Sequence, residues 1–303
     1  MHIEREGNHE SDKQTGGPKG EPMMQPEEMS IRTPFLRFGA KGWGNSHGLP
    51  VLGLHGWLDN AATFDRLAPH LPELHLVSLD MAGHGRSEHR PAGMKYHYVD
   101  YIDDVIAVAD ALGWHRFALL GHSLGGGIAS VVAGCFPERV SHLLLLDGIG
   151  PMSREADTVA QSLSRSVKQM KQQIGKKRPV YADFDSAVAA RIKVGDMKPE
   201  SVQILVARNL VETDGGVTWR SDPRLKIGSP VYMTEEQVQG VLREIKAPTL
   251  LMTGDGGLLK RMDRLQARGA CIGNIRQQLL HGGHHLHLDD PEPVAAIIQE
   301  FLA

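Results

Sequence analysis

The 303-residue chain has few cysteines, no long apolar run and little net charge, and each shortage excludes a class of protein. Its two cysteines, Cys135 and Cys271, lack metal-ligand spacing and are too few for a disulfide framework, so a reducing, cytoplasmic compartment fits best. Its longest apolar runs, such as residues 143–146, are far too short to cross a bilayer. A net charge of −3 gives no reason to expect a nucleic-acid or membrane partner.

Residues 1–30 are polar, rich in glycine and proline, and without a hydrophobic period. They lack the apolar stretch of a signal peptide, and we predict a disordered tail. The remaining length can bury a sizeable core, either as one large domain or as a core with an insertion. With 41% hydrophobic and 23% charged residues, the composition is that of a soluble globular protein.

Apolar runs alternate with amphipathic segments along most of the chain. Strands are expected at 31–38, 50–54, 74–79, 117–120, 140–146, 249–252 and 274–280. Continuous apolar strands separated by helices predict an α/β fold, with a mostly parallel sheet covered on both faces. Its core should comprise residues 31–151 and 246–303.

Residues 152–245 break this alternation. They show helical stripes and a short glycine-containing bend at 215–219, so we expect an all-helical insertion. The stripe through Val159, Leu163, Val167, Met170 and Ile174 is expected to serve packing rather than ligand binding.

Residues 121–126, Gly-His-Ser-Leu-Gly-Gly, join an apolar strand to a helix of small residues. In the pattern G-x-S-x-G the serine stands in a sharp turn, and the glycines leave room for it, which makes Ser123 the candidate nucleophile. Two main-chain N–H groups should form the oxyanion hole. One is that of Leu124, directly after the nucleophile, and the other is that of Trp57, in the loop after the second buried strand.

A serine hydroxyl needs a base to take its proton and a carboxylate to orient that base. His284 is the favoured base because it follows two glycines after a strand near the carboxyl terminus, at the sheet edge expected for Ser123. Two acids compete for the third role. Asp147 follows the strand at 140–146, and Asp255 follows the strand at 249–252.

Four histidines near the carboxyl terminus form a cluster that could hold a metal, namely His281, His284, His285 and His287. No Cys or Glu stands at ligand spacing, so we predict neither a metal nor a cofactor. His285 and His287 are expected to pack or to line the site.

Several motifs, in this order, resemble those of the α/β-hydrolase superfamily across residues 31–303. They are His-Gly-Trp at 55–57, Asp-x-x-Gly-His-Gly-x-Ser at 80–87, the serine motif at 121–126, and Gly-His-x-x-His-Leu-Asp-x-Pro-Glu at 283–292. Residues 145–151 and 216–223 resemble the serine hydrolase-like branch. The resemblance implies a helical cap inserted after the sixth strand, Ser123 as nucleophile, His284 as base, and oxyanion amides at Trp57 and Leu124.

One position departs from the family pattern. The usual acid lies three residues after a glycine that ends the seventh strand; counted from Gly254 this is Gly257, which has no carboxylate. Some relatives, the haloalkane dehalogenases among them, place the acid after the sixth strand, so we favour Asp147 over Asp255. A serine at position 123 argues against dehalogenase or epoxide-hydrolase chemistry, which uses an aspartate there.

The sequence therefore predicts a carboxylesterase-like serine hydrolase that cleaves an ester-type, small-molecule acyl substrate through a Ser-His-Asp triad and an acyl-enzyme. One alternative is a ligand-binding or sensory protein with little turnover, which the missing acid at position 257 permits. Another is a hydrolase of a C–C bond. The sequence does not reveal the oligomeric state, so a homo-oligomer stays open.

Overall fold

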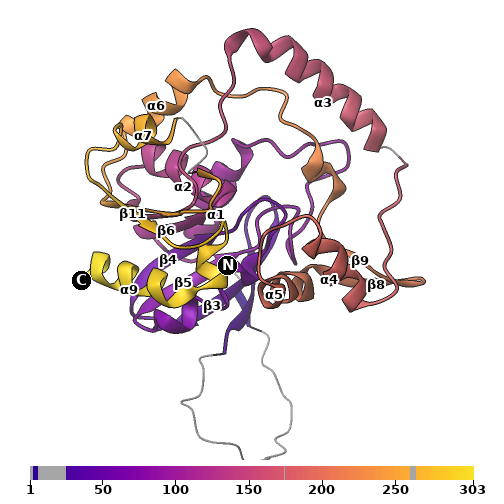
Figure 1. Ribbon diagram of the computed structural model, residues 1–303, viewed down its shortest axis with the longest axis horizontal. Helices are drawn as coiled ribbons and strands as arrows, with labels where there is room; N and C mark the ends of the chain where they lie inside the picture. The colour runs from indigo at the N-terminus through magenta and orange to yellow at the C-terminus, as the bar shows by residue number, and fades with distance from the viewer. Residues whose placement is uncertain (1–2, 6–24, 174, 260–263) are drawn as a thin grey trace, which may run out of the picture.

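The computed structural model describes residues 3–5, 25–173, 175–259 and 264–303 (Figure 1). Among these, the main sheet has nine strands in the order β1-β2-β3-β5-β4-β6-β7-β10-β11. Their bounds are β1 Ile3–Arg5, β2 Glu27–Arg32, β3 Arg37–Gly44, β4 Leu49–Leu54, β5 Leu74–Leu79, β6 Phe117–His122, β7 Val140–Leu146, β10 Thr249–Gly254 and β11 Ile275–Leu280. The strands β5, β4, β6, β7, β10 and β11, which are neighbours in the sheet, run parallel to one another. The pairs β1–β2, β2–β3 and β3–β5 are antiparallel.

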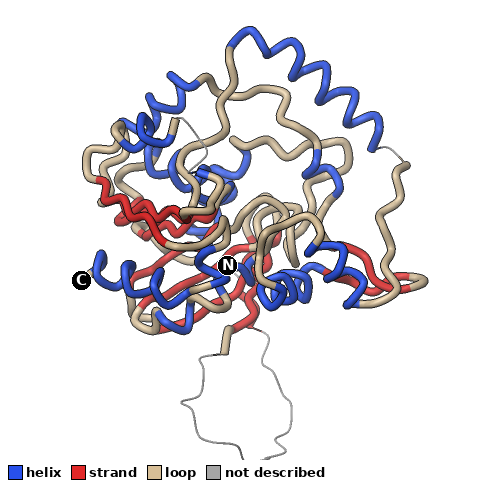
Figure 2. Tube along the Cα trace, viewed as in Figure 1, coloured by secondary structure: helices blue, strands red, loops and turns tan. Residues whose placement is uncertain are grey.

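Helices cover both faces of the sheet, as predicted (Figure 2). The side chains of β6 alternate between two cores, with Leu119 in one and Leu120 in the other. The first core also contains residues of α1 (Asp100–Ala111), α2 (Leu124–Cys135) and α6 (Glu235–Arg243). The second contains residues of the 3₁₀ helices η1 (Ala61–Phe64) and η2 (Ala68–His70) and of α9 (Pro291–Leu302). Burial on both faces explains why the central strands are continuously apolar.

The register of the parallel strands brings three loops to one edge of the sheet. Leu54 of β4 pairs with Gly121 of β6, and Leu146 of β7 pairs with both His122 and Met252. The carboxyl ends of these strands are therefore level, and the loops that follow them are neighbours.

The amino-terminal boundary differs from the prediction of a tail to residue 30 and a strand at 31–38. Residues 27–32 form β2, whose Met29 and Ile31 are buried while polar residues alternate with them. Thr33 turns the chain into β3, because its hydroxyl accepts the N–H of Leu36 and donates to the carbonyl of Leu36. The rest of the predicted tail, apart from residues 3–5 and 25–26, lies outside the described residues.

The insertion contains α3 (Val159–Gln173), α4 (Phe184–Ile192), α5 (Pro199–Asn209) and the 3₁₀ helices η3 (Ala156–Thr158) and η4 (Pro223–Lys226), followed by α6. The expectation of helices alone is wrong at β8 (Leu210–Thr213) and β9 (Gly216–Trp219), which pair antiparallel. Gly215 and Gly216 adopt φ of 83° and 142°, conformations that glycine tolerates and that allow the tight reversal. Two main-chain hydrogen bonds between Tyr181 and Val217 add a further bridge to this hairpin.

The helix α3 lies at the outer edge of the molecule (Figure 1). The expected packing of its apolar stripe is wrong in part, since Val159, Leu163 and Val167 remain 44%, 44% and 51% exposed. Ile174, the last residue of that stripe, lies outside the described residues. The buried side is formed by Ser162 and Ser166 instead. Among the described residues, no helix is long and apolar enough to span a membrane.

Candidate active site

Ser123 stands in a strained turn between β6 and α2, with φ of 52° and ψ of −111°. Three glycines allow other backbone segments to approach this turn. A Cβ at Gly121 would lie 2.5 Å from the carbonyl oxygen of Gly125, and one at Gly148 would lie 2.3 Å from that of Ser123. At Gly125, a Cβ would lie 2.1 Å from the carbonyl oxygen of Leu54. Side chains at these positions would displace backbone, so the glycines permit the exposed serine.

The structure brings together Ser123, His284 and Asp147. His284 lies in the loop after β11, and its Nε2 is 2.8 Å from the Oγ of Ser123. Its Nδ1 is 2.5 Å from Oδ2 of Asp147. Because a carboxylate only accepts, Nδ1–H donates to Asp147, which leaves the Nε2 lone pair to accept the hydroxyl proton of Ser123. The three groups form a continuous chain of hydrogen bonds.

Asp147 directly follows β7 and is 1% exposed. Its N–H donates to the carbonyl of Met252 in β10, and its Oδ2 also accepts the N–H of Leu258 at 2.7 Å. A Cβ at Gly257 would lie 2.6 Å from Oδ1 and 2.7 Å from Oδ2 of Asp147. The glycine that breaks the family pattern thus leaves room for the carboxylate from the neighbouring loop.

Asp255 has different partners. Its Oδ2 is 3.0 Å from Nδ1 of His281, and its Oδ1 accepts the N–H of Gly282 at 3.0 Å. Asp255 therefore contacts the first residues of the loop that carries His284. Asp147 contacts the imidazole of His284 itself.

The two predicted oxyanion donors lie on adjoining loops. Gly125 donates its N–H to the carbonyl of His55, which joins the serine turn to the loop after β4. Leu124 begins α2, so its N–H has no acceptor within the helix. The ring of Trp57 is 51% exposed, and its Nε1–H donates to the carbonyl of Leu225 in η4. This ring therefore contacts the insertion rather than the core.

Two buried histidines hold the loop that carries Trp57. His84 accepts the N–H of Leu58 at its Nε2, where Leu58 has a φ of 62°. His55 accepts the N–H of Met81 at Nε2 and donates from Nδ1 to the carbonyl of Gly56. Burial, assisted by His55, lowers the pKa of His84 to about 3, and burial also lowers the pKa of His55. Both rings are neutral near pH 7 and serve as fixed hydrogen-bond partners. Both belong to motifs noted in the sequence, but their partners are set by the fold.

The carboxyl-terminal histidines point to different partners. His281 has a side chain that is 98% exposed, whereas His285 and His287 are buried. Nε2 of His285 is 3.0 Å from Oδ2 of Asp59, and Nε2 of His287 is 2.9 Å from the hydroxyl of Thr63. The sequence predicted packing or polar lining for His285 and His287, and both rings are buried.

His122 and Asp59 are neighbours of the site that the sequence did not single out. His122 donates from Nε2 to the carbonyl of His284 at 3.0 Å, which ties the residue before Ser123 to the loop of the base. Asp59 accepts from His285 and contacts Arg191 of α4. His122 occupies a variable position of the serine motif, so its spacing alone carried no signal for this contact.

The insertion is anchored to the core through a buried ion pair. Asp80 follows β5, is fully buried, and accepts Arg208 Nε of α5 at 3.0 Å on both oxygens. The same carboxylate accepts the N–H groups of Ala61 and Arg86. A second carboxylate, Glu28 of β2, receives Arg208 Nη1 at 2.8 Å. Arg208 thus connects the insertion to β2 and to the end of β5.

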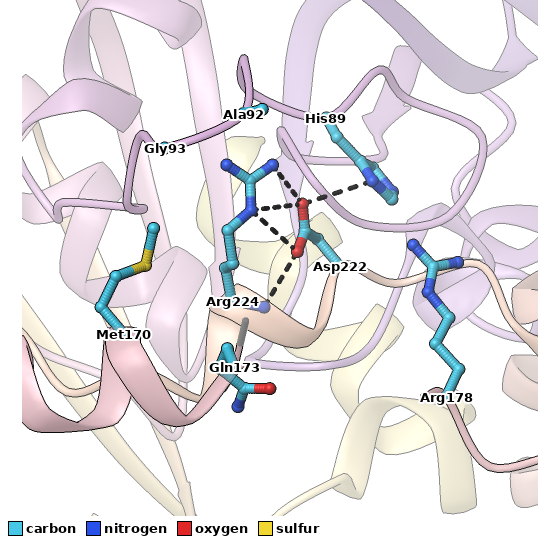
Figure 3. A pocket seen from close by; sticks show the side chains of 8 residues that line it. All are labelled: His89, Ala92, Gly93, Met170, Gln173, Arg178, Asp222 and Arg224. Carbon is cyan, nitrogen blue, oxygen red and sulfur yellow. Dashed lines mark hydrogen bonds and ion pairs between the residues drawn. The ribbon is translucent and has the colours of Figure 1, made fainter. Parts of the chain in front are cut away.

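A cavity of about 380 Å³ lies between α3 and the loop at 89–94 (Figure 3). Its wall is stabilised by Asp222, which pairs with Arg224 at 2.6 Å and with His89 at 3.3 Å. Its lining contains none of the residues that surround Ser123. The cavity therefore lies between the insertion and the loop at 89–94, apart from the hydrogen-bonded triad.

Comparison with known proteins defines the class. Residues 50–291 match the family described as alpha/beta hydrolase fold, and the chain belongs to this family. It is similar to a protein of Danio rerio named serine hydrolase-like protein, with 34% identity over 91% of this chain and 88% of that one. A crystal structure of a hypothetical protein from Pseudomonas aeruginosa superposes with a TM-score of 0.87 and 41% identity, over 91% of this chain and 99% of that one. The thioesterase domain from the curacin biosynthetic pathway has a TM-score of 0.79 and 26% identity, over 91% and 99% of the two chains.

Proposed function

We propose that this protein is a serine hydrolase that cleaves an ester-type acyl substrate. The observation that carries the proposal is the chain of hydrogen bonds from Asp147 through His284 to Ser123, located beside two loops that can supply oxyanion donors. The names of its relatives support it: serine hydrolase-like protein for the Danio rerio protein, and thioesterase for the curacin-pathway domain.

In this mechanism the Oγ of Ser123 attacks the acyl carbon while Nε2 of His284 takes the hydroxyl proton. Asp147 holds the imidazole in the required tautomer and stabilises the imidazolium that forms. The N–H groups of Trp57 and Leu124 donate to the oxyanion. His284 then protonates the leaving group, and a water molecule releases the acyl group by the reverse sequence.

Ser123→Ala tests the proposal. We expect it to abolish both steady-state turnover of p-nitrophenyl esters and labelling by a fluorophosphonate, because no nucleophile remains. Ser164→Ala is the matched control, since Ser164 is an exposed serine of α3 and its loss should change neither readout. Turnover and labelling that persist in Ser123→Ala would contradict the proposal.

The alternative of a binding protein drew on the missing acid at position 257. The Asp147 carboxylate lies against that position and hydrogen-bonds His284, so the imidazole has a carboxylate partner and we prefer hydrolysis. A burst of product without a steady state would favour the binding protein instead.

We also propose a cytoplasmic location, supported by two free thiols, those of Cys135 and Cys271. Fractionation of cells that express the chain checks this, and recovery in an oxidising compartment would contradict it.

A further inference from the structure

Three buried side chains from separate parts of the chain meet behind the Ser123–His284 pair. Asp59 lies in the loop after β4, His122 ends β6, and His285 follows the predicted base. Oδ2 of Asp59 is 3.0 Å from Nε2 of His285 and 3.7 Å from Nδ1 of His122. The three atoms that could bind a metal, one from each residue, lie within 4.8 Å of one another, and all three residues are buried.

His122 presents an unused lone pair to this cluster. Because its Nε2–H donates to the carbonyl of His284, the neutral ring has its lone pair on Nδ1. That nitrogen is fully buried and makes no hydrogen bond, although it faces the carboxylate of Asp59. A histidine that donates one ring N–H to a main-chain carbonyl and aims its other nitrogen at a shared point has the arrangement typical of a metal ligand.

A lone pair of His122 and a carboxylate oxygen of Asp59 face each other across 3.7 Å. Histidine nitrogen and carboxylate oxygen are both ligands that zinc takes in proteins.

The two distances from Asp59 Oδ2, 3.0 Å to His285 and 3.7 Å to His122, fit a transition-metal ion. Zinc binds histidine nitrogen and carboxylate oxygen at about 2.0–2.2 Å, so an ion can lie just off the line between two atoms that are 3.7 Å apart. Gly56 leaves these atoms uncrowded, since a Cβ there would lie 2.8 Å from Asp59 Oδ2 and 2.9 Å from His122 Nδ1. On binding, the ion replaces the Nε2 proton of His285; in the neutral ring this proton passes through water to Nδ1, and from the imidazolium it is released to water. Arg191, 3.4 Å from the other oxygen of Asp59, opposes the cation and weakens its binding.

We propose that Asp59, His122 and His285 bind a divalent transition-metal ion of the Zn²⁺ class. The sequence predicted no metal because the carboxyl-terminal histidine cluster has no Cys or Glu at ligand spacing. Only one of these three ligands, His285, belongs to that cluster. The fold supplies the other two from residues more than half the chain away. The proposal does not depend on the hydrolytic activity, because Zn²⁺ binding is measured without a substrate.

The test measures Zn²⁺ binding to the full chain after removal of metals with a chelator, by competition with a chromogenic zinc indicator. We expect one buried ion per chain and a Kd raised about tenfold or more in Asp59→Asn and in His285→Gln, because each loses a ligand. His281→Gln is the matched control, since it removes a neighbouring but exposed histidine that lies beside Asp255. Circular dichroism confirms that each variant is folded.

Crystals of the unmodified protein soaked in Zn²⁺ provide a readout that needs no variant. Diffraction at the zinc absorption edge should show an anomalous peak between Asp59 and His122. An unchanged Kd in both ligand variants, no bound ion in the unmodified protein, or a peak only beside His281 and Asp255 would overturn the proposal. Fluorophosphonate labelling of Ser123 reports separately on the proposed hydrolase.

Discussion

The carboxylate of Asp147 occupies the space beside His284 that a side chain at Gly257 would need, because a Cβ on Gly257 would lie only 2.6 Å from Oδ1 of Asp147. The family pattern puts an acid at position 257, whereas in this chain the carboxylate reaches the same space from the loop after β7. The two positions therefore exclude each other, and the exchange of one acid for the other is open to experiment.

Moving the acid back should restore part of the activity lost by removing it. Asp147→Gly should lower kcat by about 10⁴-fold, the order expected when an imidazole loses its orienting carboxylate. Glycine also suits the φ of 44° at this position. Adding Gly257→Asp should regain about tenfold or more of kcat. The matched control adds Gly256→Asp instead. Equal rates for the two double variants would contradict the inference that a carboxylate at position 257 can replace that of Asp147 beside His284.

The two candidate acids should differ sharply in their effect on turnover. Asp147→Asn should lower kcat by about 10⁴-fold, because an amide favours the wrong tautomer of His284. Asp255→Asn should have a much smaller effect, because Asp255 contacts His281 and the N–H of Gly282 rather than the imidazole of His284. Steady-state kcat with a p-nitrophenyl ester decides between them. An inactive Asp255→Asn variant together with an active Asp147→Asn variant would show that Asp255, not Asp147, is the acid that orients His284.

The parallel sheet and its two covered faces were predictable because strands such as β6 and β10 are continuously apolar, and burial on both faces requires such runs. The strand β2 could not be predicted, because most residues of Glu27–Arg32 are polar and the segment adjoins a glycine- and proline-rich stretch. A sequence motif could locate Ser123 and His284 on loops at one sheet edge. A motif could not predict the contact between Asp59 and His122, because that contact depends on how the loop after β4 packs against the end of β6.

Gly125→Ala should damage the serine turn. The new Cβ would lie 2.1 Å from the carbonyl oxygen of Leu54, a backbone atom that cannot move without shifting the Trp57 loop. We expect loss of fluorophosphonate labelling and destabilisation of about 1–3 kcal/mol in urea unfolding. Gly240→Ala is the control, because a Cβ on this α6 residue meets nothing within 4 Å, and alanine should stabilise the helix by up to about 1 kcal/mol. Full labelling of Gly125→Ala would argue against the close approach of these loops.

Asp80→Asn should strongly destabilise the protein, because it leaves the buried guanidinium of Arg208 without its main carboxylate. Breaking one partner of a buried pair costs about 3–5 kcal/mol, and the measurement is the free energy of unfolding in urea. Glu300→Gln serves as the control, because its pair with Arg276 lies on the surface and its loss should change stability little. Equal effects of the two substitutions would contradict the anchoring role of Asp80.

Acid should destabilise the fold through the buried neutral histidines, and His84 provides the test. Its pKa is about 3 in the folded protein against 6.5 for an unperturbed histidine, so between these values only the unfolded chain binds the proton. Stability then falls as the pH falls through this window, by about 2 kcal/mol for one such histidine between about pH 7 and about pH 5. His55 acts in the same direction, whereas the raised pKa of His285 acts in the opposite one, because Asp59 outweighs its burial. Urea unfolding of His84→Gln at the two pH values should show a loss smaller by about 2 kcal/mol than that of the unmodified protein. An identical loss in both proteins would mean that His84 is protonated in the folded state.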